Sequence, residues 1–209
     1  MTARLRAPVR RQAIADAALE VIADRGVAGF TAAAVAARVG TTDAALFHHF
    51  RSKADIVVVA LSRVEELIFA DFPPIAADPL ARLALFFRQR VAVMQRHPGI
   101  ARLLTSDHLA QLAGPEGAES ARQLPARSRG FVIACLEEAA AAGSLADGVG
   151  PIDAAVLVLG SLMALTQVAG FPVESAISPD VAERVWADLE RLFRSHPPPV
   201  PSPKEWSPK

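Results

Sequence analysis

The sequence contains a single cysteine, Cys135, and no tyrosine. One thiol forms neither an intramolecular disulfide nor a cysteine zinc cluster, so a packed apolar core is the expected source of stability. A lone thiol fits a reducing cytoplasmic location, which we expect for this protein. The longest apolar stretch, residues 154–169, is too short and too interrupted to span a membrane, and no apolar run follows the N-terminal arginines as in a signal peptide. We therefore expect no membrane association.

Sustained alternation of apolar and polar residues, which indicates half-buried strands, is also missing. Alanine is abundant and apolar residues recur at helical spacing, which predicts an all-α fold. Glycines, prolines and capping hydroxyls divide the chain into expected helices over residues 9–25, 32–39, a third segment through residue 50, 53–70, 79–96, 99–112, 124–142, 151–169 and 179–195. Residues 114–117 are expected to form a turn. A helix over about 118–142 follows, in which Pro125 either kinks the helix or starts a new one, and we favour a start near residue 124.

These elements suggest three parts. Residues 1–53 form an N-terminal three-helix head, residues 54–195 form a larger helical domain, and residues 196–209 form a proline-rich tail that we expect to be disordered. The formal net charge is zero, but the head holds eight basic and four acidic residues whereas the remainder holds 14 basic and 18 acidic ones. Such an asymmetry steers the head toward phosphate; the alternative is a solvated arginine-rich terminus.

Two short helices of the head are joined through Gly40, Thr41 and Thr42. Glycine permits a sharp turn and a threonine hydroxyl caps the next helix, which together predict a helix-turn-helix. Its second helix would enter the major groove of double-stranded DNA, where base edges are readable. Leu46 and Phe50 are one helical turn apart and are expected to face inward.

Residues 31–53, TAAAVAARVGTTDAALFHHFRSK, resemble the DNA-binding head of the TetR family of transcriptional regulators. The preceding IADAALEVIADRGVAGFT resembles the family's first helix, and residues 96–104, RHPGIARLL, resemble a segment common in one subset of the family. The positions that match the head motif are Thr31, Val35, Ala36, Gly40, Thr41, Thr42, Leu46, Phe47, His49, Phe50, Ser52 and Lys53. The resemblance implies a helix-turn-helix head followed by a C-terminal helical domain that binds a ligand and dimerises.

The resemblance also implies roles for individual residues. Phe47, His49 and Lys53 correspond to positions at or near the phosphate backbone, and Thr31 and Thr42 to helix starts beside phosphate. The groove-facing positions are Asp43, Ala44, Ala45 and His48. The candidate DNA-binding set is Arg10, Thr31, Thr41, Thr42, Asp43, Ala45, Phe47, His48, His49 and Lys53.

Each role has a plainer alternative. Phe47 replaces the commoner tyrosine and is either a contact residue or part of the core; Asp43 either reads a base or favours the helix N-terminus through the macrodipole. His48 and His49 are otherwise surface histidines or half of a metal site, but no second histidine pair accompanies them, so we expect no metal. The alanine-rich reading face predicts few direct base hydrogen bonds and a larger part for DNA shape.

Family members dimerise through their last two helices, here residues 152–169 and 179–193. The resemblance therefore implies an interface that mixes small and aliphatic residues: Leu157, Gly160, Ser161, Ala164, Val181, Val185, Leu189 and Leu192. The alternative is that both apolar stripes serve only the core of one subunit.

By the same analogy, a small-molecule pocket lies among the central helices. Its candidate lining is mostly apolar and suits a lipophilic effector, although each residue is otherwise ordinary core: Phe86, Phe87, Leu103, Leu104, Phe131, Cys135, Met163 and Gln167. The nearby polar residues either orient a polar group of the ligand or face solvent: Arg88, Arg90, His97, His108 and Gln111.

The sequence shows no glycine-rich phosphate loop, paired-carboxylate signature or oxyanion-hole motif, so we expect neither an enzyme nor a bound cofactor. The leading hypothesis is a homodimeric repressor that a small lipophilic ligand releases from its operator DNA. The alternative is a ligand-independent architectural or cell-cycle DNA-binding protein that acts through a protein partner.

Overall fold

The expected all-α fold is confirmed by a computed structural model, which describes residues 7–26, 29–106, 112–167 and 179–194. The predicted tail at 196–209 lies outside the described residues. The helices are α1 (Ala7–Arg25), α2 (Ala32–Arg38), α3 (Asp43–Phe47), α4 (Lys53–Ile68), α5 (Pro79–Arg96), α6 (Gly99–Leu104), α8 (Gly114–Ala141), α9 (Pro151–Gln167) and α10 (Pro179–Phe193).

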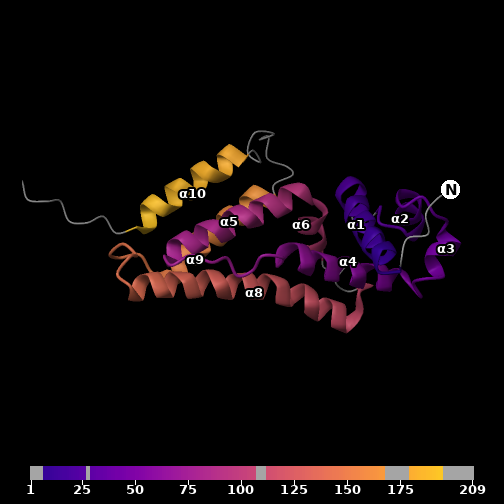
Figure 1. Cartoon of the computed structure of the whole chain (residues 1–209), viewed down its shortest axis with the longest axis horizontal. Coiled ribbons are helices and arrows are strands. Elements are labelled where there is room, and N and C mark those ends of the chain that lie inside the picture. Colours follow the sequence, from indigo (N-terminus) through magenta and orange to yellow (C-terminus); the bar gives the residue numbers. More distant parts are fainter. Residues whose placement is uncertain (1–6, 27–28, 107–111, 168–178, 195–209) are drawn as a thin grey trace, which may run out of the picture.

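The molecule is elongated, with α1, α2 and α3 together at one end and α10 toward the other (Figure 1). We call the part formed by α1–α3 the head and the part formed by α5, α8, α9 and α10 the body. Helix α8 runs along the molecule beneath α4 and the body helices (Figure 1). The head is therefore presented at a free end, and α4, α6 and α8 link it to the body.

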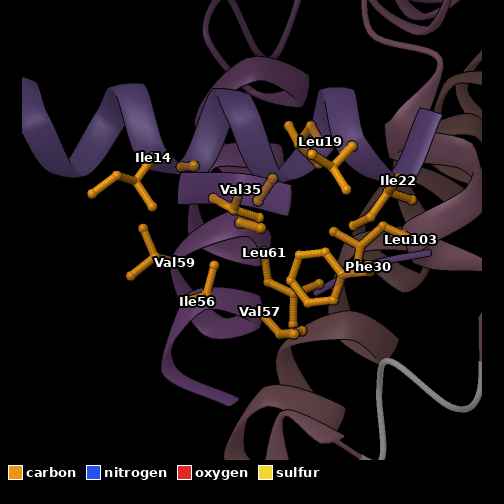
Figure 2. Close-up of a cluster of buried hydrophobic side chains, with 14 of the residues drawn as sticks. Ile14, Leu19, Ile22, Phe30, Val35, Ile56, Val57, Val59, Leu61 and Leu103 are labelled. Carbon is orange, nitrogen blue, oxygen red and sulfur yellow. The ribbon is translucent and has the colours of Figure 1, made fainter. Parts of the chain in front are cut away.

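The head core is built from aliphatic residues of α1, α2 and α4 around the ring of Phe30 (Figure 2). Ile22, Phe30 and Val35 are fully buried, and Val57 of α4 packs among them. Leu46 and Phe50 are buried, as their spacing predicted. The same cluster includes Leu103 of α6 and Leu124 of α8, so the core of the head continues into the linking helices without a break.

The body has a second and more aromatic core. Phe87 of α5 packs against Trp186 of α10, with ring centroids 5.4 Å apart, and Phe86 and Phe193 are almost completely buried. Alanines and valines of α8 and α9 fill the space between these rings. This packing fixes α5, α8, α9 and α10 as one unit.

The structure corrects two expectations about helix limits. Helix α8 begins at Gly114, where a turn was expected, and it continues through Pro125, where a new helix was expected to start. A proline inside a helix removes one backbone hydrogen bond, at a cost of about 3 kcal/mol. Burial on both sides of Pro125 offsets this cost, because Ala121 and Leu124 pack in the head core whereas Val132 and Leu136 pack in the body core.

Helix α6 is shorter than expected. It ends at Leu104 rather than near residue 112, and the Thr105 hydroxyl donates a hydrogen bond to the Ala101 carbonyl at 2.8 Å. Among the described residues, no helix is long and apolar enough to cross a membrane.

Candidate functional site

The turn between α2 and α3 has the local geometry that its sequence predicts. The Thr31 hydroxyl accepts a hydrogen bond from the Ala34 N–H at 3.1 Å and so caps α2, and Thr42 caps α3 through the Ala45 N–H at 3.2 Å. Gly40, between the two helices, has a φ of +68°, a left-handed conformation that glycine adopts without strain. These contacts fix the direction in which α3 leaves the head.

Helix α3 exposes nearly its whole surface. Leu46 is its only buried residue, whereas Asp43, Ala45 and Phe47 are exposed, and His48 and His49 after it are exposed too. Phe47 has 42% of its surface accessible, which is at odds with a role in the core. The proposed base-reading residues therefore share a helix that no other part of the described chain covers.

The remaining candidate DNA contacts gather around α3. Arg10 Nη1 is hydrogen bonded to His49 Nε2 at 3.3 Å, which joins α1 to the end of the recognition segment. Lys53, at the start of α4, holds its Nζ 5.0 Å from the centroid of the Phe30 ring. Thr31 is exposed and Thr41 is half-buried. The proposed phosphate donors thus come from separate helices.

Ion pairs within the molecule occupy most of the acidic side chains of the head. Arg38 binds both Glu20, at 2.9 Å, and Asp24, which ties α2 to α1, and hydrogen bonds with these carboxylates raise the pKa of Arg38. Arg63 of α4 binds Asp16 at 2.7 Å. Because these pairs are local, the basic residues near α3 face solvent with little opposing charge.

The body contains a cavity of about 360 Å³ between the end of α4 and helices α5, α6, α8 and α9. Of the pocket residues proposed from the sequence, Phe86, Leu104 and Met163 line it. The further lining residues come from all five helices and their ends: Ile68, Arg90, Met94, Thr105, Leu124, Pro125, Ser128, Arg129, Leu159, Leu162 and Thr166.

The other proposed pocket residues lie elsewhere. Phe87 and Cys135 are buried in the body core, Leu103 is buried in the head core, and Phe131 stacks against Phe72 and Phe86 without lining the cavity. Burial raises the pKa of the Cys135 thiol. The side chain of Gln167 lies outside the described residues. Helical spacing identified apolar residues but did not separate the cavity wall from the solid core or from the exposed face of α9.

For Arg90, the sequence left open whether the side chain contacts a ligand or faces solvent. It is only 7% exposed, and it lies on the cavity wall. Its Nη1 donates to the Ile68 carbonyl and its Nη2 to the Ser128 hydroxyl, both at 3.2 Å, whereas its Nε has no hydrogen-bond partner. Burial lowers the pKa of Arg90 to about 10, so the group remains charged at neutral pH.

The residues proposed for a dimer interface divide into two groups. Leu157, Gly160, Ala164 and Leu192 are exposed, and Ser161 is half-buried. By contrast, Leu189 is buried in the body core, and Val181 and Val185 pack against that core. On α10, these three residues therefore pack within the subunit, whereas Leu192 is exposed.

Helix α9 keeps an apolar face in solvent. Ile152, Val156, Leu157 and Met163 are each about half exposed or more, at 57, 64, 48 and 55%. Four exposed aliphatic or thioether side chains on one short helix form a patch of the kind found at protein interfaces. Elsewhere in the described chain, no group of three or more histidine, cysteine or acidic side chains is placed to hold a metal ion.

The fold and the exposed α3 define a helix-turn-helix DNA-binding regulator. Residues 14–60 match the family described as bacterial regulatory proteins, tetR family. The match covers the head and the start of α4, so this part of the chain resembles the DNA-binding segment of that family.

Solved structures support the same fold over nearly the whole chain. The ketosteroid transcriptional regulator KstR2 of Mycobacterium tuberculosis aligns with a TM-score of 0.73 and 19% identity, covering 90% of this chain and 96% of that protein. AibR in complex with isovaleryl coenzyme A and operator DNA aligns with a TM-score of 0.67 and 23% identity, covering 88% of this chain and 98% of AibR. At these identities the likeness concerns the fold alone.

Curated relatives match a shorter part. The nucleoid occlusion factor SlmA of Aliivibrio fischeri is 35% identical over 108 residues, which are 50% of this chain and 55% of that protein. The chain thus spans about half the length of the curated relatives it matches.

Proposed function

We propose that this protein is a homodimeric transcriptional repressor that holds operator DNA through its head and releases it when a small apolar molecule enters the body cavity. The observation that carries the proposal is the apolar cavity of about 360 Å³, which falls within the usual size of ligand pockets. Residues 1–53 act as the DNA-binding domain and residues 54–195 as the regulatory and dimerisation domain.

In this proposal, α3 lies in the major groove. Asp43, Ala45 and His48 face base edges, while the basic and hydroxyl groups around them hold phosphates: Arg10, Thr31, Thr41, Thr42, His49 and Lys53. Phe47 packs its exposed ring against the backbone of the DNA. The proposal is supported by the exposure of these side chains and by the pairing of the acidic residues of the head away from them.

Helix α6 is the proposed route from the cavity to the head. Its end, at Leu104 and Thr105, lines the cavity, while its start packs on α1 so closely that a Cβ at Gly99 would lie 2.0 Å from the Leu19 carbonyl oxygen. Arg102 reinforces this contact by donating hydrogen bonds to the carbonyls of Ile22, at 3.3 Å, and Ala23. A ligand that displaces α6 would therefore displace α1 and change the position of the head.

Two heads are needed to reach two half-sites about one DNA turn apart. We propose that the exposed apolar face of α9, including Leu157, Gly160 and Ala164, pairs with its copy across a two-fold axis, with Ser161 and Leu192 at its border. Burial of this face in a dimer would remove the patch from water.

The test begins with selection of binding sites from random DNA by the purified full chain. Binding of the selected duplex is then followed by fluorescence anisotropy while apolar small molecules are added. The proposal predicts a two-fold symmetric consensus and a compound that both raises the melting temperature and releases the DNA. Failure to select any DNA sequence at low salt would refute it.

A second candidate function is suggested by the curated relatives. Their match to nucleoid occlusion factors is longer than the matched head, so it reaches beyond the DNA-binding motif. In this candidate the chain is an architectural or cell-cycle DNA-binding protein that needs no small ligand and contacts a protein partner through its acidic body. DNA release by a small molecule would exclude it, and DNA binding that persists with every stabilising compound would favour it.

A further inference from the structure

The cavity wall is mostly apolar, and its one buried charged group is the guanidinium of Arg90. Arg90 lies in the middle of α5 and is 7% exposed. Burying a charge is costly unless it is paired, and lysine and arginine are therefore rarely buried without an acidic partner. Among the described residues, no carboxylate forms an ion pair with Arg90.

The described groups that contact this guanidinium are neutral, although Arg127 packs on the same Phe69 ring. Two aromatic rings face the guanidinium, with Cζ 4.9 Å from the centroid of Phe86 and 5.3 Å from that of Phe69. The Ile68 carbonyl and the Ser128 hydroxyl accept one hydrogen bond each, whereas Nε donates none. A guanidinium has five N–H donors, so this environment orients the group but leaves donors unused.

The oriented donors border open space rather than packed atoms. Ile68, Phe86 and Ser128, which hold Arg90 in place, all line the same cavity. Most of the remaining wall is formed by aliphatic and thioether side chains such as Met94, Leu159 and Leu162, with Thr105, Thr166 and Arg129 as its other polar residues. A fixed cation at one point of an apolar cavity is complementary to a molecule with an apolar body and an anionic end.

We propose that the cavity binds an amphipathic carboxylate, and that the guanidinium of Arg90 receives its carboxylate group while the apolar wall receives its chain. This inference rests on the proposed ligand-responsive function and names the chemical class of the ligand. A cavity of about 360 Å³ has room for roughly a dozen non-hydrogen atoms at the ~30 Å³ that a water molecule occupies in the liquid. A medium-chain acid therefore fits.

The cavity has a second cation, Arg129, but its position is different. Arg129 is exposed on α8, so solvent screens its charge and hydrates it. Selectivity for an anion is expected to come from Arg90, because a hydrogen bond from a buried charged donor is worth more than one that competes with water.

The test compares three probes of equal chain length: octanoate, 1-octanol and octylamine. Their binding to the full-length wild-type protein is measured by isothermal titration calorimetry at neutral pH. We expect octanoate to bind at least tenfold more tightly than 1-octanol and octylamine to bind least. Equal affinity of octanoate and 1-octanol would overturn the inference, and this comparison needs no variant.

The second arm uses Arg90→Met, which keeps the length of the side chain and removes its charge. We expect this variant to lose at least tenfold in octanoate affinity and to keep its 1-octanol affinity within about threefold. The matched control is Arg88→Met, because Arg88 lies on the same helix but pairs with Glu183 at 2.8 Å on the surface. Unchanged octanoate affinity in Arg90→Met, or an equal loss in Arg88→Met, would contradict the assignment.

A third measurement separates this inference from the proposed function. The anisotropy of the selected operator duplex is followed with each probe. Binding of 1-octanol as tight as that of octanoate, with DNA release, overturns the role of Arg90 and keeps the ligand-responsive repressor. Tight and Arg90-dependent binding of octanoate without DNA release keeps the ligand class and counts against the repressor. Binding of none of the three probes refutes the proposed ligand class.

Discussion

The head and the body of this protein are built on different kinds of core. The head is packed with alanine and branched aliphatic residues around Phe30 (Figure 2). The body is packed with aromatic rings, and it retains both a cavity and a buried charge at Arg90. The aliphatic core of the head buries Leu46 and so anchors α3, whereas in the body Phe86 borders a cavity that a ligand can fill.

The comparison also shows where the two regions depend on each other. Helix α6 contributes Ile100 and Leu103 to the head core, and its C-terminal end lines the body cavity. His97 and Gly99 lie at the start of this helix, next to α1. The four predictions below test the separation of the two regions and the junction between them.

The largest effect is expected at the junction. In Gly99→Ala, the new Cβ would meet the Leu19 backbone carbonyl at 2.0 Å, so α1 and α6 must move apart. We expect the free energy of unfolding to fall by about 3 kcal/mol, measured by urea denaturation. The control is Gly130→Ala in α8, where a Cβ meets nothing and the substitution should stabilise the protein by about 0.5–1 kcal/mol. Equal stability of the two variants would contradict the close packing of α6 on α1.

The next effect concerns the surface of the body. Leu157→Glu places a carboxylate on the exposed face of α9, and in a two-fold dimer it would face its own copy. We expect the dissociation constant of the dimer to rise at least tenfold, which sedimentation equilibrium measures. Ile75→Glu changes an aliphatic residue that is 93% exposed outside the helices, and it should leave the dimer intact. A dimer that survives Leu157→Glu would move the interface away from α9.

A smaller effect is expected in the head. Lys53→Ala should weaken binding of all DNA sequences, because the lysine is proposed to hold a phosphate rather than a base. The slope of log K against log salt should decrease by about one unit, which anisotropy titrations at several salt concentrations measure. Arg122→Ala, in the exposed part of α8, should leave the slope unchanged. An unaltered slope in Lys53→Ala would remove it from the phosphate contacts.

The smallest effect is a pH dependence at the junction. Burial lowers the pKa of His97 below its usual 6.5, so the unfolded chain takes up this proton at a higher pH than the folded protein does. The free energy of unfolding should therefore fall as the pH decreases through about 6.5, until the pH is below the folded pKa. Urea denaturation between pH 8 and 5 should show a weaker decrease in His97→Gln. Identical pH profiles would show that His97 titrates alike in both states.

The local parts of the head could be predicted from the sequence because they depend on neighbouring residues. Thr31 and Thr42 cap their helices, and Leu46 and Phe50 are buried at one-turn spacing. The limits of α5, Pro79–Arg96, also follow from local signals, since proline begins the helix and His97–Pro98 ends it. The helix-turn-helix motif extends over fewer than thirty residues, so no distant contact is needed to recognise it.

The tertiary structure decided which side chains are buried, because burial depends on which helices pack over each residue. Helical periodicity assigned the same apolar character to Leu157 of α9 and Leu189 of α10. In the structure Leu189 is buried, because α10 packs on α5 and α9, whereas Leu157 stays exposed. It also favoured a new helix start near Pro125 over one long helix, because the two cores that hold α8 on either side are not visible in the chain. Arg90 could not be distinguished from a surface arginine, since its burial requires the end of α4 and the middle of α8 to meet α5. The sequence by itself therefore determined the helices and the DNA-binding head, whereas the cavity and its charge arise only where distant helices pack together.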